Sequence, residues 1–301
     1  MDYTAFPTPE LGLYGERSGV DGFFVGSLGA IRGEGGKVYW GTNTALGDAA
    51  TSSFGRDDFA AIAAAGGQVI LSFGGASNVP LESEVTDATR ISATYTDIIQ
   101  NYGVLNIDFD FEGGFISNVP VMSRHVAAIS AVLQARPNLN ISYTLPVDGA
   151  PGLRGFDDDS VSFLRSLADA GIRPSLINAR ARAFGEGAPA DLFDATVVVL
   201  NGAHRQISQV WPNLDTSQVW RGMGVCPMFG LRNDGVFTLN NMRQLRKFAT
   251  EHQIGCLSGW DATRDYNGGQ SQAGQNMSKY TGIEQDPFDF CKIIAEYEPD
   301  A

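Results

Sequence analysis

The sequence has only three cysteines among its 301 residues, and it has no long apolar run. Cys226, Cys256 and Cys291 are widely spaced and lack CxxC or CxxH neighbours, so the sequence suggests neither a disulfide framework nor a zinc site. Cys226 and Cys256 lie in apolar strand patterns, where a thiol is expected to behave as a small hydrophobe. No stretch approaches the roughly 18 apolar residues of a membrane span.

Basic residues are also few. The 21 Lys and Arg are outnumbered by 34 Asp and Glu, and the net charge of −13 argues against nucleic acid and anionic membranes as partners. The first twelve residues have neither a basic region nor an apolar region of a leader, which predicts a cytoplasmic protein, or a secreted one if a leader has been removed. No phosphate loop, dinucleotide fingerprint or metal-ligand spacing is present, so no metal or cofactor is predicted. The three histidines, His125, His204 and His252, lie in helical patterns and are expected to be surface or helix residues rather than ligands.

The most informative run is residues 106–113, which read NIDFDFEG. Asp108, Asp110 and Glu112 alternate with apolar residues, and this period of two is typical of a strand. Acids at alternate positions lie about 7 Å apart, so their repulsion is expected to leave at least one of them protonated near neutral pH. Two glycines end the run abruptly, as where a buried strand meets an active-site loop. The pattern favours a catalytic strand over a solvated acidic edge strand.

Apolar runs bounded by glycine alternate with amphipathic stretches along the chain, which predicts parallel strands covered by helices. The expected strands are residues 2–6, 22–28, 69–72, 106–113, 141–145, 176–183, 223–228 and 256–260. The expected helices are residues 57–65, 83–102, 123–135, 157–170, 190–207, 240–252 and 287–296. The sequence therefore predicts one domain, residues 1–301, of the α/β class: a (β/α)8 TIM barrel with its chemistry at the C-terminal ends of the strands.

Several motifs, in order along the chain, resemble those of glycoside hydrolase family 18, the chitinases and chitinase-like proteins. The acidic run resembles the last three acids of the family signature DxxDxDxE, with Leu105 at the position of the first Asp. The other resembling segments are residues 72–75 (SFGG), 143–146 (YTLP), 226–230 (CPMFG) and 258–260 (SGW). The resemblance runs from about Tyr3 to Tyr297. It implies a barrel enzyme that binds an oligosaccharide or another small molecule.

Glu112 is the last of the three acids and the nearest to the expected C-terminal end of its strand, where barrel active sites lie. We therefore expect Glu112 to donate the proton, Asp110 to keep its proton affinity high, and Asp108 to support Asp110 from deeper inside. A substrate pocket is expected around them, with Trp260 as its aromatic floor, while Trp40 either lines a subsite or packs in the core. The residues assigned to substrate binding are Trp40, Tyr143, Arg180, Arg182, Phe184, Met228 and Trp260.

One segment departs from the family. Relatives carry a run like VNIMAMDYG on the sixth strand, whereas residues 177–185 here read INARARAFG. Arg180 and Arg182 stand at methionine positions, and Ala183 and Phe184 replace an Asp and a Tyr. In the family that Asp and Tyr position the substrate's N-acetyl group, which attacks the anomeric carbon. Losing such polar groups costs about 10²–10³ in rate for each, so little chitinase activity is expected.

The two arginines lie two residues apart and therefore share one face of the expected strand. Buried guanidinium groups need a counter-charge. Arg180 and Arg182 either pair with the acidic strand or recognise an anionic or strongly accepting group of a ligand, and the sequence leaves both interpretations open.

Three functions follow. The first is a biosynthetic enzyme built on the chitinase scaffold. It would use Glu112 for the cyclisation, isomerisation or elimination of a small molecule other than chitin. The second is a chitinase or endo-N-acetylglucosaminidase that hydrolyses β-1,4-linked N-acetylglucosamine. The third is a non-catalytic chitinase-like carbohydrate-binding protein. The retained Glu112 and the altered sixth strand favour the first.

Overall fold

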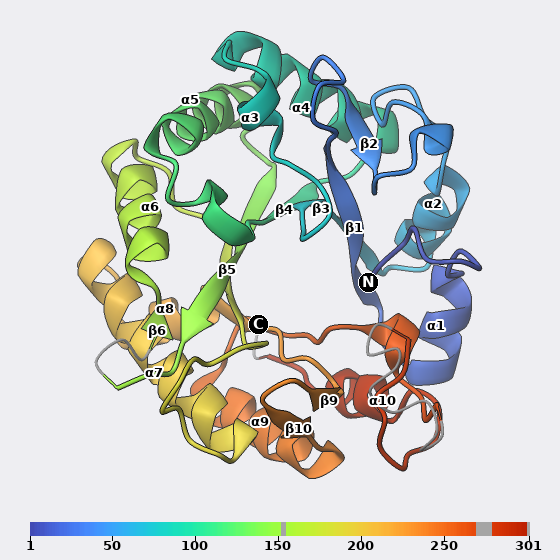
Figure 1. The fold of residues 1–301 in the computed structure, drawn as a ribbon, viewed down its shortest axis with the longest axis vertical. Helices are drawn as coiled ribbons and strands as arrows, with labels where there is room; N and C mark the ends of the chain where they lie inside the picture. The colour runs from blue at the N-terminus through green and yellow to red at the C-terminus, as the bar shows by residue number, and fades with distance from the viewer. Residues whose placement is uncertain (152–154, 269–278, 300–301) are drawn as a thin grey trace.

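A computed structural model describes residues 1–151, 155–268 and 279–299. At its centre is a curled sheet surrounded by helices (Figure 1). The hydrogen-bonded strand order is β11-β8-β7-β5-β4-β3-β1-β2, with β6 paired to β5 off this path. From β1 to β11 the neighbouring strands are parallel, while β2 and β6 are antiparallel additions. The expected α/β fold is confirmed.

The elements alternate as the sequence pattern predicts. The strands are β1 (Gly22–Ala30), β2 (Val38–Trp40), β3 (Gln68–Gly74), β4 (Asn106–Asp110), β5 (Asn140–Asp148), β6 (Gly155–Phe156), β7 (Leu176–Arg180), β8 (Met223–Val225), β9 (Gly230–Arg232), β10 (Gly235–Phe237) and β11 (Cys256–Leu257). The helices are α1 (Leu11–Ser18), α2 (Arg56–Ala64), α3 (Leu81–Glu84), α4 (Ala88–Tyr102), α5 (Val119–Ala135), α6 (Asp158–Asp169), α7 (Leu192–Val210), α8 (Thr216–Arg221), α9 (Leu239–His252) and α10 (Asp289–Ala295). Short 3-10 turns lie at Thr44–Leu46, Gly113–Phe115 and Ala262–Arg264.

The strand expected at residues 2–6 is wrong in extent. Only an isolated parallel bridge forms there, between Asp2 and Gly26 of β1. The backbone N–H of Asp2 also donates to the Asp261 carboxylate at 3.0 Å, just beyond β11. Asp2 thus lies between the first and last parallel strands, where no strand ladder joins β1 to β11 within the described residues. The strand and helix order is that of a (β/α)8 barrel.

The helix expected at residues 83–102 is two helices, α3 and α4. Asp87 begins α4 by accepting a hydrogen bond from the N–H of Thr89 at 2.9 Å, so the chain breaks just before it. Helices α1 and α8 and the β9–β10 hairpin are not predicted by the sequence pattern, because these elements are short and carry weak periodicity.

The apolar face of β4 determines which way its acids point. Phe109 is buried between the sheet and the helices, where its ring lies 5.4 Å from Phe73 and 5.5 Å from Tyr143. Burial of this face directs the alternate acidic residues into the barrel. In the part of the chain that the structure describes, no helix has both the length and the apolarity needed to cross a membrane.

Candidate active site

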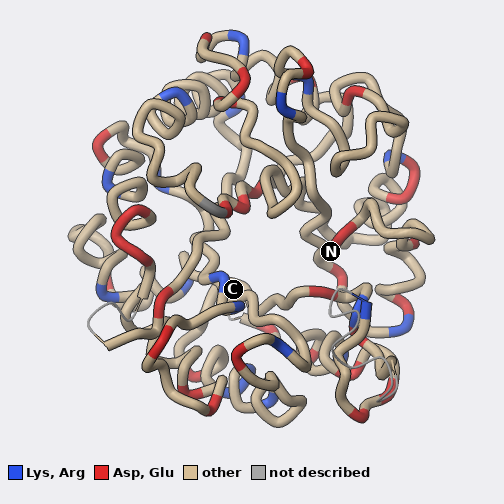
Figure 2. Tube along the Cα trace, viewed as in Figure 1, with Lys and Arg blue, Asp and Glu red and all other residues tan. Residues whose placement is uncertain are grey.

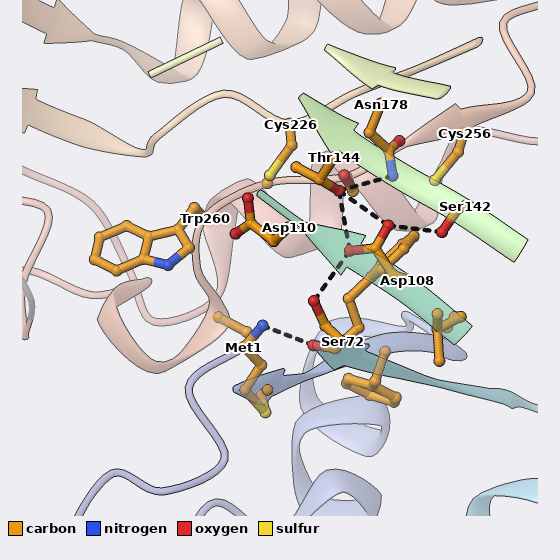
Figure 3. Close-up of a pocket in the computed structure, with 18 of the residues that line it drawn as sticks. Met1, Ser72, Asp108, Asp110, Ser142, Thr144, Asn178, Cys226, Cys256 and Trp260 are labelled. Carbon is orange, nitrogen blue, oxygen red and sulfur yellow. Dashed lines mark hydrogen bonds between the residues drawn. The ribbon is translucent and has the colours of Figure 1, made fainter. Parts of the chain in front are cut away.

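Asp108 lies deepest of the three acids and is held by hydroxyl groups from both neighbouring strands (Figure 3). Its Oδ1 accepts hydrogen bonds from Ser142 Oγ at 2.7 Å and Thr144 Oγ1 at 3.1 Å, and its Oδ2 accepts one from Ser72 Oγ at 3.0 Å. Only 1% of Asp108 is exposed. Burial raises its pKa to about 6, the hydroxyl groups oppose this, and the neighbouring Asp110 adds to it.

Arg180 connects the two outer acids. Its Nη1 lies 3.1 Å from Asp110 Oδ1 and 2.9 Å from Glu112 Oε1, so one nitrogen contacts both carboxylates. Arg180 ends β7, and β5 lies between β7 and the acidic strand β4. The guanidinium therefore reaches past β5 to the acids, and Figure 2 shows acidic and basic positions near the centre of the molecule, inside the ring of helices. The arrangement is a partly buried ion-pair cluster.

Arg182 is held less closely. Its Nη1 lies 3.6 Å from Glu112 Oε1 and its Nη2 lies 3.9 Å from Asp110 Oδ2, both too long for a hydrogen bond. Nη2 donates weakly to Cys226 Sγ at 3.9 Å, and Nε is buried with no hydrogen-bond partner among the described residues. The guanidinium carbon lies 5.3 Å from the centre of the Trp260 ring, within cation–π range.

Glu112 lies two residues beyond the end of β4, in an extended conformation. Burial raises its pKa, the nearby Asp110 adds to this, and Arg180 and Arg182 oppose it. Its side chain is 24% exposed, so it has access to solvent and to the cavity. A carboxyl group with these properties suits proton transfer near neutral pH.

The carboxylates open onto a cavity of about 1020 Å³ along the barrel axis. Its lining runs from Gln68 and Asn140 at the N-terminal ends of strands to Glu112 and Trp260 at the C-terminal end. Ser72, Ser142, Thr144 and Asn178 form a polar layer between these ends. Trp260 is half-buried and lies at the side of the cavity away from Asp108 (Figure 3). The space is large enough for a saccharide or a similarly sized ligand.

Comparison with known proteins supports the family. No family model matches the chain. The "Probable bifunctional chitinase/lysozyme" of Escherichia coli K12 is 25% identical over 322 residues, which cover 99% of this chain and 34% of that protein. Endochitinase 11 of Metarhizium anisopliae is 24% identical over 286 residues, covering 88% of this chain and 51% of that protein. The chain therefore resembles chitinases over most of its length, and this similarity supports a chitinase-like assignment of the glycoside hydrolase family 18 type.

Solved structures agree with this fold. The catalytic domain of a hyperthermophilic chitinase from Pyrococcus furiosus superposes with a TM-score of 0.86 at 23% identity, covering 99% of this chain and 92% of that one. A family 18 chitinase from Pseudoalteromonas aurantia gives 0.61 at 12% identity, covering 88% and 94%. The chitinase-like chain thus has the fold of these enzymes, although it spans only 34% and 51% of the length of the two curated relatives.

Among the residues assigned to the site of this chitinase-like protein, the structure brings the acids, the two arginines and Trp260 together. The other four residues assigned to substrate binding are not among those that line the cavity. Trp40 is fully buried in a cluster of rings, and its indole N–H donates to the Tyr102 hydroxyl at 2.7 Å. Met228 forms an isolated bridge with Trp260 and lies outside the set of residues that line the cavity.

Strand geometry explains the positions of the other two, Tyr143 and Phe184. Tyr143 alternates with Ser142 and Thr144, which face the lumen, so Tyr143 points outward, where its hydroxyl lies 2.9 Å from His125 Nε2. Phe184 lies beyond the end of β7, and its ring is buried beneath the Arg232 guanidinium at 4.9 Å. Because the chain leaves the strand before this residue, the alternation that aims Arg180 inward does not reach Phe184.

Several residues of the cavity were not predicted from the sequence. Ser142, Thr144 and Asn178 line it, and Cys226 and Cys256, expected to be core hydrophobes, line it too. The sequence of β5 does indicate two of them, because Ser142 and Thr144 alternate with apolar residues as the acids of β4 do.

A second buried network lies behind the acidic strand. Glu82 is fully buried, and its Oε1 is 2.8 Å from His125 Nδ1 and accepts from the Tyr95 hydroxyl at 2.8 Å. His125 lies in α5, as expected of a helix histidine, but it is fully buried rather than on the surface. Its ring packs edge-on against Phe109 of β4 at 4.5 Å, so this network supports the strand that carries the acids.

Proposed function

We propose that this chain is an acid/base enzyme on the family 18 scaffold, that its substrate is not unmodified chitin, and that Glu112 moves the proton. The observation that carries the proposal is the contact of Arg180 Nη1 with both Asp110 and Glu112, at 3.1 and 2.9 Å. The reactions that a single proton donor and acceptor of this kind supports are cyclisation, isomerisation and elimination.

The residues that replace the family motif change which ligands the site can bind. The resemblance implies that, in family 18, an Asp and a Tyr after the sixth strand position the N-acetyl group of chitin. Here the corresponding residues are Ala183, which has no polar side chain, and Phe184, which is buried beneath Arg232. Arg182 lies over Trp260, so a sugar that stacks on this ring has to share it with a guanidinium or displace the guanidinium.

Hydrolysis of β-1,4-linked N-acetylglucosamine is the second candidate. It is favoured by the chitinase names of both curated relatives and by a Pyrococcus furiosus chitinase domain of the same fold, which was solved in complex with chito-oligosaccharides. The presence of Glu112 and Trp260 at one cavity agrees with it. The ion pairs of Arg180 weigh against it, because they occupy both acids nearest the strand end.

Turnover by wild type and by Glu112→Gln tests the proposed role of Glu112. A panel of chromogenic glycosides and small carboxylic acids is incubated with each protein, and products are followed by mass spectrometry. Any activity should fall by about 10²–10⁴ in Glu112→Gln, while Tm changes little because Glu112 is partly exposed. Full activity in Glu112→Gln would show that this carboxyl group is not the proton donor.

A further inference from the structure

Arg182 lines the cavity and Arg180 contacts two of its carboxylates, and the two arginines differ in how many close hydrogen-bond partners they have. Arg180 makes close contacts with two carboxylates, at 3.1 and 2.9 Å. Arg182 has ion pairs no shorter than 3.6 Å, a weak bond to the Cys226 thiol, and a buried Nε without a partner among the described residues. A guanidinium normally presents a fork of donors to a planar acceptor such as a carboxylate. In this structure the fork of Arg182 is largely unused.

The charges that face Glu112 come from two strands. Asp110 ends β4, with Asp108 deeper in that strand, while Arg180 ends β7 and Arg182 lies two residues beyond it. The two outer carboxylates and the two guanidiniums therefore balance one another. An added anion disturbs this balance, because it offsets the positive field of Arg182 and repels the carboxylate of Glu112.

We propose that the cavity binds a carboxylate-bearing saccharide through Arg182, and that Glu112 takes up a proton as this saccharide binds. The inference rests on the proposed acid/base role of Glu112 and specifies the substrate class. The ligand carboxylate pairs with the guanidinium of Arg182, and its ring lies beside Trp260 in the cavity of about 1020 Å³. The proton comes from solvent and converts the Glu112 carboxylate to the carboxylic acid; no other bond changes in this step.

Because ligand binding and protonation are coupled, Glu112 becomes a proton donor only when an anionic substrate is bound. Without an anionic ligand, the pairing with Arg180 favours the ionised form of Glu112 and opposes the effect of burial. With the ligand bound, the neutral carboxylic acid is the favoured form and lies at the strand end. A neutral saccharide lacks the charge that produces this change, so it gains no proton donor on binding.

Titration calorimetry of three tetrasaccharides tests this inference. The probes share a β-1,4 linkage and differ in charge: a tetramer of glucuronic acid, of N-acetylglucosamine and of glucosamine. Each is titrated at several pH values in two buffers of different ionisation enthalpy, which gives the number of protons exchanged. The glucuronic acid tetramer should bind most tightly and take up as much as about one proton, and its Kd should rise by up to about tenfold per pH unit. The N-acetylglucosamine tetramer should bind without proton uptake.

Three variants separate the parts of the proposal. Arg182→Met should weaken the binding of the glucuronic acid tetramer by at least about 30-fold, whereas Arg165→Met, on the exposed face of α6, should leave it unchanged. Glu112→Gln should retain binding and lose both the proton uptake and the pH dependence of Kd. Equal affinity for the acidic and neutral tetramers, or proton uptake that persists in Glu112→Gln, would overturn the inference. Either result leaves the proposed function standing, because that is decided by the loss of turnover in Glu112→Gln.

Discussion

Arg180 and Glu112, from strands on opposite sides of β5, meet at 2.9 Å between Nη1 and Oε1. The same nitrogen contacts Asp110 at 3.1 Å. The acid that the resemblance marks as the proton donor is therefore held by a cation that the family motif does not supply. Of the two interpretations that the sequence left open for the arginines, the structure favours pairing with the acids for Arg180 and leaves recognition of a ligand to Arg182.

This difference predicts unequal effects on stability. Arg180→Met removes the closest counter-charge of two partly buried carboxylates and should lower the free energy of unfolding by about 3 kcal/mol. Arg182→Met should lower it by less than about 1 kcal/mol, because its ion pairs are long. Chemical denaturation of both variants, with Arg165→Met as control, measures this. Equal losses in the two variants would contradict the distinction drawn between them.

Asp108 predicts a pH dependence of stability. Its pKa in the folded protein is raised to about 6 by burial, above the value of about 4 for an unfolded chain. Between these values the folded state binds more protons than the unfolded state, so stability falls as pH rises from about 4 to 6. The loss should be on the order of 2–3 kcal/mol relative to Asp108→Asn, which cannot titrate. Parallel stability curves for the two proteins over this range would refute the assignment.

The network behind the acidic strand should matter to folding. Burial alone would raise the pKa of Glu82, but contacts with His125 and Tyr95 hold it below its usual value, so the group is ionised and paired. Glu82→Gln should destabilise the protein by about 3–5 kcal/mol, as for breaking a buried pair. The control is Glu251→Gln, whose ion pair with Lys247 is exposed. Similar unfolding midpoints for the two variants would mean that the network contributes little.

The acids could be predicted from sequence because period-two alternation with Phe109 and Phe111 fixes their face once that apolar side is buried. The same alternation turns Tyr143 outward, a position that the resemblance of residues 143–146 to the family motif does not indicate. Trp40 could not be placed in this way. It belongs to a short antiparallel strand, β2, and its burial depends on contacts with Tyr3 and Tyr102 from distant parts of the chain.

The contact between Arg180 and Glu112 could not be predicted either. Strand periodicity gives the face on which each side chain lies. It does not give which side chains of that face meet, since that depends on strand order and register. The sequence placed both arginines on one face, and only the three-dimensional arrangement distinguishes the close pairing of Arg180 from the loose pairing of Arg182.

We propose that the segment from Arg180 to Ala183 gives this chitinase-like site a substrate other than chitin. Hydrolysis of a chromogenic chitobioside by wild type and by a triple variant, Arg180→Met with Arg182→Met and Ala183→Asp, tests it most directly. The triple variant restores the family pattern and leaves Phe184 unchanged, because that residue is buried outside the cavity. Wild type should show no turnover or very slow turnover, and the triple variant should be faster by at least about 10²-fold. Vigorous hydrolysis by wild type, at a rate that the triple variant does not exceed, would contradict the account.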